Sequence, residues 1–346
     1  MNYLRITLGA MMLLMLGHAH AAKTDIIVLA NGNAVTGEIK ALDFGSLEYS
    51  TDSMGTVFVD WEDVVGITSN QQLQVEVSNG ARYFGNLESS DERFQINVIT
   101  LSGSVELETT RIIRITPIHT EESFIQRLEG DILIGYNSQK TTEVSTMNLV
   151  GDIRYRTQQY LVGLKANSTI TEQSSEDTSK RASITGNFQR FRGNRWFTDW
   201  FTGWDHDDAL GIDQRLTAGG AIGRYVIQTN THLLSLMGGL QAVHTTFIDY
   251  PIIGQEPATK DAEGRIQTRY LYRSRNPDRR VTFTSNVFPL LEDFSHIRAD
   301  TDLSISFDII SDLYFEVLLF HTYSSTPPLG AEQEDWGITT SIGYSF

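Results

Sequence analysis

The chain has 346 residues, a formal net charge of −16, and no cysteine. The acidic balance argues against a nucleic-acid-binding protein, which needs a basic surface. The absence of cysteine excludes disulfides, thiolate metal sites and a cysteine nucleophile.

The first 22 residues have the pattern of a secretory signal peptide. Arg5 precedes an apolar stretch from Ile6 to Leu16, and small residues surround the predicted cleavage site after Ala21 or Ala22. The apolar stretch is too short to span a bilayer as a helix, which takes about 20 residues. We therefore expect a cleaved leader and an exported protein.

Residues 23–119 contain an internal repeat. Residues 25–67 and 73–115 align at an offset of 48, which matches two Asn-Gly pairs and several further glycines. Asn-Gly pairs favour the positive φ angles of tight hairpins. We predict two tandem SH3-like or Sm-like β modules. With 14 acidic and 6 basic residues, this region does not suit nucleic acid.

Residues 120–127 read as a linker, and residues 128–346 divide into about twelve segments of membrane-strand length. Many segments alternate, as where Leu303, Ile305 and Phe307 are interleaved with polar residues. An apolar outer face and a polar inner face are typical of a barrel in lipid. The segments are expected near 128–137, 145–156, 160–171, 180–191, 195–205, 211–225, 231–247, 265–274, 280–290, 297–309, 313–323 and 336–346.

The connections between these segments alternate in length. Short turns are expected at sites such as 157–159 and 192–194, and long loops at 172–179, 206–210, 249–264 and 324–335. Outer-membrane barrels have short periplasmic turns and long outer loops. With an even number of strands, both ends of the barrel region and the N-terminal modules would lie in the periplasm.

The last segment ends in an alternating, aromatic-tipped strand. Ile338, Thr340, Ile342, Tyr344 and Phe346 share one face. Barrels of the outer membrane close with such a strand, and an aromatic residue at the interface fits that role. We predict that Tyr344 and Phe346 form the signal read by the barrel-assembly machinery, with outer-membrane lipids around the barrel.

Two stretches of the barrel region are distinctive. One combines Asp207 with 211–215 and 219–223, and the other runs over 327–346. In these stretches the chain resembles an uncharacterised bacterial family that includes salt-induced, outer-membrane β-barrel proteins. The resemblance covers most of the barrel region and implies a location and a fold. It implies no reaction, because the family's activity is undefined. The chain departs from the family at 137–141.

One dense group of metal-binding residue types occurs, Asp205, His206, Asp207 and Asp208. Consecutive strand residues face opposite ways, so these four would converge on a cation only in a loop. A solvated acidic loop tip is the alternative. No Ser-centred or His-centred catalytic pattern stands out, so we expect no enzyme and no cofactor.

Four charged residues are expected inside the barrel. Asp213 and Arg215 are two apart on one predicted strand, and Asp152 and Arg154 on another. Charges at membrane depth face inward and pair. We expect a charge network in the lumen, which either fixes the strands or forms a constriction that selects ions.

The expected outer loops are rich in carboxylates, which divalent cations would bridge beside anionic lipid headgroups. Ordinary solvation of a polar loop is the alternative. Aromatic residues near the strand ends are predicted to form the girdles of the membrane interface.

The sequence thus predicts an all-β protein: a transmembrane antiparallel barrel preceded by two small β modules. The leading functional prediction is a structural, interaction or envelope-stress role, with the modules contacting a periplasmic partner. A narrow diffusion channel for small ions or solutes is the second, and a lipid-modifying enzyme the third.

Overall fold

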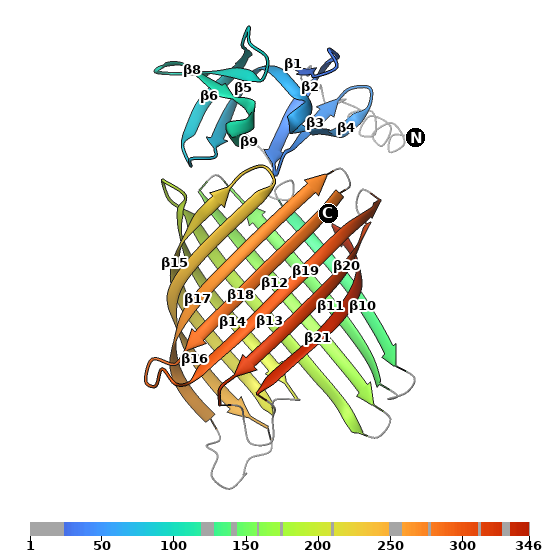
Figure 1. Cartoon of the computed structure of the whole chain (residues 1–346), viewed down its shortest axis with the longest axis vertical. Helices are drawn as coiled ribbons and strands as arrows, with labels where there is room; N and C mark the ends of the chain where they lie inside the picture. The colour runs from blue at the N-terminus through green and yellow to red at the C-terminus, as the bar shows by residue number, and fades with distance from the viewer. Residues whose placement is uncertain are drawn as a thin grey trace, which may run out of the picture.

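The computed structural model shows two parts, an N-terminal domain (24–118) and a large barrel (128–345), which Figure 1 displays one above the other. The predicted signal peptide, the predicted linker 120–127 and Phe346 lie outside the described residues. In the described residues, no helix combines the length and the hydropathy needed to cross a membrane. The structure describes residues 24–118, 128–139, 144–157, 159–173, 176–208, 211–248, 258–275, 278–310, 313–326 and 333–345.

The N-terminal domain is a nine-stranded, all-antiparallel sheet with two 3₁₀ turns. Its strand order is β4-β3-β2-β1-β5-β6-β7-β8, with β9 paired to β2 and β5. The elements are β1 (Asp25–Leu29), β2 (Ala34–Asp43), β3 (Ser46–Thr51), β4 (Gly55–Asp60), η1 (Trp61–Asp63), β5 (Val64–Val77), β6 (Arg82–Ser89), β7 (Gln95–Thr100), β8 (Gly103–Glu108), η2 (Thr109–Arg111) and β9 (Ile112–Pro117).

The repeat seen in the sequence recurs in the fold. β4 and η1 have counterparts in β8 and η2 at the same offset of 48 residues, and the indole of Trp61 donates to the carbonyl of Thr109 across that offset, at 2.8 Å. The glycines of both Asn-Gly pairs, Gly32 and Gly80, have positive φ angles of 87° and 84°. The turn chemistry of the two halves is therefore the same.

The two repeats do not form separate sheets. β5 runs through both: its first residues pair with β1, and its later residues pair with β6 and β9. One hydrophobic cluster also spans both repeats, from Ile27 in β1 to Ile115 in β9. The domain is thus one folding unit with internal pseudo-symmetry, and its likeness to SH3 or Sm modules stays a prediction.

The barrel is closed and antiparallel, and its twelve strands confirm the predicted strand number. Each strand pairs with its chain neighbour, and β21 returns to β10. The strands are β10 (Leu128–Gln139), β11 (Val144–Arg156), β12 (Tyr160–Gln173), β13 (Glu176–Phe191), β14 (Trp196–Asp207), β15 (Ile212–Gln228), β16 (His232–Phe247), β17 (Ala258–Arg275), β18 (Asp278–Pro289), β19 (Ile297–Ile310), β20 (Leu313–Ser324) and β21 (Glu334–Ser345).

Several strands are longer than predicted, which changes the loops. β12 continues to Gln173 and β13 begins at Glu176, so the expected loop 172–179 is mostly strand. β17 begins at Ala258 and takes in much of the expected loop 249–264. The prediction was wrong here because polar residues were read as loop, although inward-facing strand positions of a barrel are also polar.

The two ends of the barrel are named here the domain end and the loop end. The domain end carries the turns 192–195 and 229–231, which contact the N-terminal domain. The loop end is the opposite one. β21 runs towards the domain end, as Figure 1 shows.

A hydroxyl buried in the N-terminal domain gives a first prediction. The Tyr49 hydroxyl donates to the carbonyls of Asp25 at 2.6 Å and Val35 at 3.0 Å in alternative orientations, and the ring is fully buried. Tyr49→Phe should destabilise the domain by about 1–2 kcal/mol, because a buried acceptor loses its partner. Hydrogen exchange of amides in 25–117 measures this. Tyr83→Phe, whose hydroxyl has no hydrogen bond among the described contacts, should leave exchange unchanged.

Candidate functional site

The polar and charged side chains of the barrel lie mainly in the lumen. Along β19, Leu303, Ile305 and Phe307 face outward, whereas Asp302 and Ser304 face inward, because side chains alternate along a strand. The same alternation holds on most of the other strands, so the majority of the charged side chains of the wall share the lumen.

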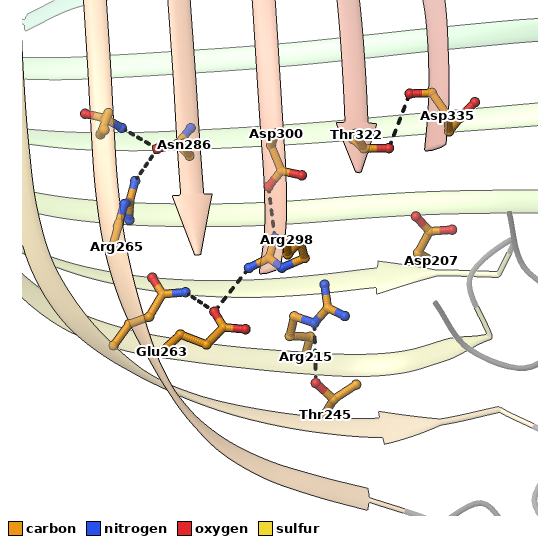
Figure 2. A network of polar contacts seen from close by, with 12 residues as sticks. Asp207, Arg215, Thr245, Glu263, Arg265, Asn286, Arg298, Asp300, Thr322 and Asp335 are labelled. Carbon is orange, nitrogen blue, oxygen red and sulfur yellow. Dashed lines mark hydrogen bonds and ion pairs between the residues drawn. The ribbon is translucent and has the colours of Figure 1, made fainter. Parts of the chain in front are cut away.

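At the loop end, Arg298 joins two strands by ion pairs. Its guanidinium lies 3.4 Å from Glu263 of β17 and 2.9 Å from Asp300 of its own strand. The amide of Gln241 donates to the same Glu263 carboxylate at 2.7 Å. The Arg298 guanidinium also lies 4.0 Å from the ring centre of Phe288. Figure 2 shows Arg298 with its partners Glu263 and Asp300 inside the barrel.

Arg265 extends this network along β17. It donates to Asn286 at 3.4 Å, and Gln267 donates to the same amide oxygen at 2.8 Å. Its guanidinium lies 4.2 Å from the ring centre of Phe201 on β14. An arginine between an aromatic ring and an amide is held by stacking as well as by hydrogen bonds.

The four metal candidates do not converge. Asp205 and Asp207 face the lumen, where Asp207 pairs with Arg181 at 3.3 Å. His206 lies on the other face, its ring stacked on Trp204, and pairs with Asp208 at 3.0 Å. The segment is the end of β14 and not a loop, so alternation separates its members. Among the described residues, no group of three or more metal-binding side chains is positioned to hold an ion.

The predicted charge network divides into two. Arg154 contacts Asp131 and lies 3.3 Å from Asp152, near the domain end. Arg215 lies near the loop end, where it donates to Thr245 at 3.3 Å. A β-bulge between Ile212 and Gln214 interrupts the alternation that would have put Asp213 on the face of Arg215.

Sequence reasoning missed a second group of arginines at the domain end. Arg269 and Arg273 of β17 face the lumen together with Arg280 of β18, and Arg273 lies directly opposite Arg280 in the ladder. Like charges at opposed positions are destabilising unless other charges or water compensate. The spacing of arginines at 265, 269 and 273, all on one face of a strand, was the available signal.

Some charged lumen side chains remain accessible to water, whereas others, such as Asp199, are buried. Lys165 on β12 and Asp302 on β19 interact electrostatically across the lumen, and both are exposed. Arg269 and Arg181 are also exposed, although the wall surrounds them. A lumen filled by packed side chains would bury these groups, so the lumen contains space that water reaches.

The N-terminal domain presents its own charged group towards the barrel. Arg114 lies 2.7 Å from Asp43 and 3.5 Å from Glu76. Burial raises the pKa of the Asp43 carboxyl, but the positive charges of Arg114, Arg156 and Arg273 outweigh it and hold the pKa below its usual range. The ion pair of Asp43 is therefore fully formed at neutral pH and is lost only as the pH falls through that lowered pKa.

The outward face of the barrel is apolar and ringed by aromatic side chains. Trp196 and Trp200 are exposed there, and Tyr160 stacks on Phe188. The ring of His232 lies beside Tyr270, whose hydroxyl is 2.8 Å from its Nδ1 atom. Tyr344 also faces outward, 49% exposed, where lipid would contact it. Such a surface requires a membrane around it.

Comparison with known protein families finds a match over residues 132–346, to the family described as protein of unknown function, DUF481. The chain belongs to the DUF481 family. The match covers nearly the whole barrel, so the architecture described above is that of a DUF481 domain. No curated protein matches the sequence.

Comparison with solved structures finds similarity to this DUF481 chain at low sequence identity. The NanC porin is 12% identical with a TM-score of 0.40, over 63% of this chain and 98% of that chain. The translocator domain of the autotransporter NalP from Neisseria meningitidis is 11% identical with a TM-score of 0.36, over 63% and 86%. CdiB from Acinetobacter baumannii is 8% identical with a TM-score of 0.36, over 80% and 66%. The DUF481 region of this chain is a closed antiparallel β-barrel.

The packing under Phe201 gives a prediction for this DUF481 barrel. A Cβ atom added at Gly219 would lie 2.6 Å from the Phe201 ring and 2.5 Å from the Leu240 carbonyl. Gly219→Val should lower the stability of the folded barrel by about 1–3 kcal/mol, because overpacking forces a wall side chain to move. The folded fraction is measured from the heat-dependent gel mobility of the barrel in detergent. Gly151→Val, with no atom within 4 Å of the added Cβ, is the matched control.

Proposed function

We propose that the protein is a narrow diffusion channel for small ions and polar solutes, with its domain end in the periplasm. The observation that carries this proposal is the water-accessible lumen, in which Lys165 and Asp302 face each other while remaining exposed. A closed wall keeps lipid out, and charges of both signs line the path.

The loop-end network is the part of the proposed path that discriminates between solutes. Arg298, Arg265 and Arg215 come from three different strands and reach into the same region as Asp205 and Glu263. Ionised groups of both signs at a narrow point attract small ions and leave uncharged, bulky solutes without compensation for lost hydration. The proposal assigns no reaction and no cofactor to the chain.

A second role, protein contact through the N-terminal domain, has one observation in its favour. Met54 and Phe58 on the β3–β4 hairpin are 60% and 64% exposed, and Leu101 on the corresponding β7–β8 hairpin is fully exposed. Exposed apolar side chains on a soluble domain favour a protein partner. A photo-crosslinking residue at Phe58 that gives one defined adduct would support this role, and an equal yield from any exposed position would count against it.

Conductance of the purified, folded protein in planar bilayers tests the channel. Arg298→Gln removes one positive charge and leaves Glu263 and Asp300 without their arginine partner. In a potassium chloride gradient, we expect the reversal potential to shift towards the potassium equilibrium potential, because the lumen becomes more negative.

Arg224→Gln is the matched control for this measurement. Arg224 lies on the outward face opposite Trp196, so it removes the same charge outside the lumen. An equal shift in both variants would mean that the network does not line the ion path. The channel would be refuted if the folded wild-type protein showed no conductance at any salt concentration and the variant described below, in which the N-terminal domain is released, showed none either.

A further inference from the structure

The N-terminal domain contacts the barrel through the turns of the domain end. The amide of Asn230 donates to the Ile112 carbonyl at 3.1 Å, and Arg195 donates to the Ser78 carbonyl. The amide of Gln228 donates to Glu76 at 3.5 Å, in a buried position. These contacts come from the β13–β14 and β15–β16 turns, and Figure 1 shows the domain lying across that end.

Charges of opposite sign face each other across the same contact. Asp43 of the domain interacts electrostatically with Arg156 and Arg273, which line the mouth from β11 and β17. Arg156 in turn experiences the carboxylates of Asp43 and Glu76 together with the positive charge of Arg114. The domain thus interacts electrostatically with β11 and β17, which lie on different sides of the mouth, in addition to the two turns that it contacts.

The contact is polar and partly open to solvent. The two hydrophobic clusters of the described residues each stay within one part: one spans Ile27 to Ile115 in the domain, and the other surrounds Phe197 and Phe201 in the barrel wall. The Asp43 side chain retains 41% of its surface for water, although barrel and domain surround it. An interface held by hydrogen bonds and ion pairs, without a shared apolar core, opens at a low cost in buried apolar area.

We propose that the N-terminal domain is a removable cap of the lumen. Asp43 and Glu76 seat it over the mouth against Arg156 and Arg273, and its departure opens the path. This inference rests on the channel function proposed above, to which it adds the element that regulates flow. The cap is a whole folded domain with its own core, so it can leave the mouth without unfolding.

An engineered disulfide tests the cap directly. An ideal Cβ atom at Gly45 lies 3.4 Å from the Cβ atom of Asn230, close to the separation of about 3.5–4.5 Å in a disulfide. The natural chain has no cysteine, so Gly45→Cys with Asn230→Cys creates a single possible bridge. We expect the oxidised protein to fall to the leak of a protein-free bilayer and to conduct again when a reductant is added.

Each single-cysteine variant is the matched control and should not respond to oxidation. Because Gly45 has a φ angle of 70°, a cysteine there is strained. A second variant, Asp43→Asn with Glu76→Gln, therefore tests the same inference without that substitution. The channel of this double variant should conduct for a larger fraction of the recording time than the wild-type channel. Combined with the cysteine pair, it should form the bridge more slowly, a readout that does not depend on conductance.

The outcomes separate the cap from the channel. Silence when oxidised and conductance when reduced supports the cap. Equal conductance in both states, with the bridge verified on a gel, overturns the cap and leaves the channel in place. Silence in every state, including the Asp43→Asn, Glu76→Gln variant with its slowed bridge formation, overturns the channel and the cap with it.

Discussion

Closure of the backbone ladder is the constraint on which the rest of the structure depends. In lipid, an unpaired N–H or C=O group costs several kcal/mol, so the first and last strands must find each other. β10 and β21 pair in an antiparallel ladder that begins with Asp131 opposite Ser345 and ends with Gly135 opposite Ser341. Closure with twelve strands brings both ends of the barrel region to one rim, and the preceding domain is therefore delivered to that rim.

Closure also decides where the charges go. With one face of every strand in lipid, the alternation of side chains leaves the lumen as the place for Arg154, Arg269 and Arg298. Their partners are then found on neighbouring strands, as Asp131 is for Arg154. The carboxylate of Asp43 in the domain interacts electrostatically with Arg273, which offsets part of the repulsion between the opposed Arg273 and Arg280.

The barrel strands and the internal repeat could be predicted from the sequence because each leaves a local pattern in it. Period-two alternation identified the barrel strands, and glycine spacing identified the repeat. Asp207 was expected in the loop 206–210 but ends β14, because a lumen-facing strand end and a polar loop have the same composition. The bulge at Asp213, the sharing of β5 between repeats and the contacts of Asp43 with the barrel all depend on pairings between distant segments, which one sequence does not display.

The pseudo-symmetry of the N-terminal domain separates features that recur in both repeats from charged residues that occur in only one. At the repeat offset of 48, Glu76 corresponds to Val28 and Arg114 to Gly66, so the ion-paired group occurs once and not twice. Shared features of the repeats, such as Gly32 and Gly80, serve the fold of the domain. Glu76 and Arg114 are half-buried or buried where the domain meets the rim, a position that ordinary stability would fill with apolar residues. Glu76 and Arg114 occur in only one of the two repeats, so the fold that the repeats share does not require them, whereas contact with the barrel rim through Gln228 uses Glu76.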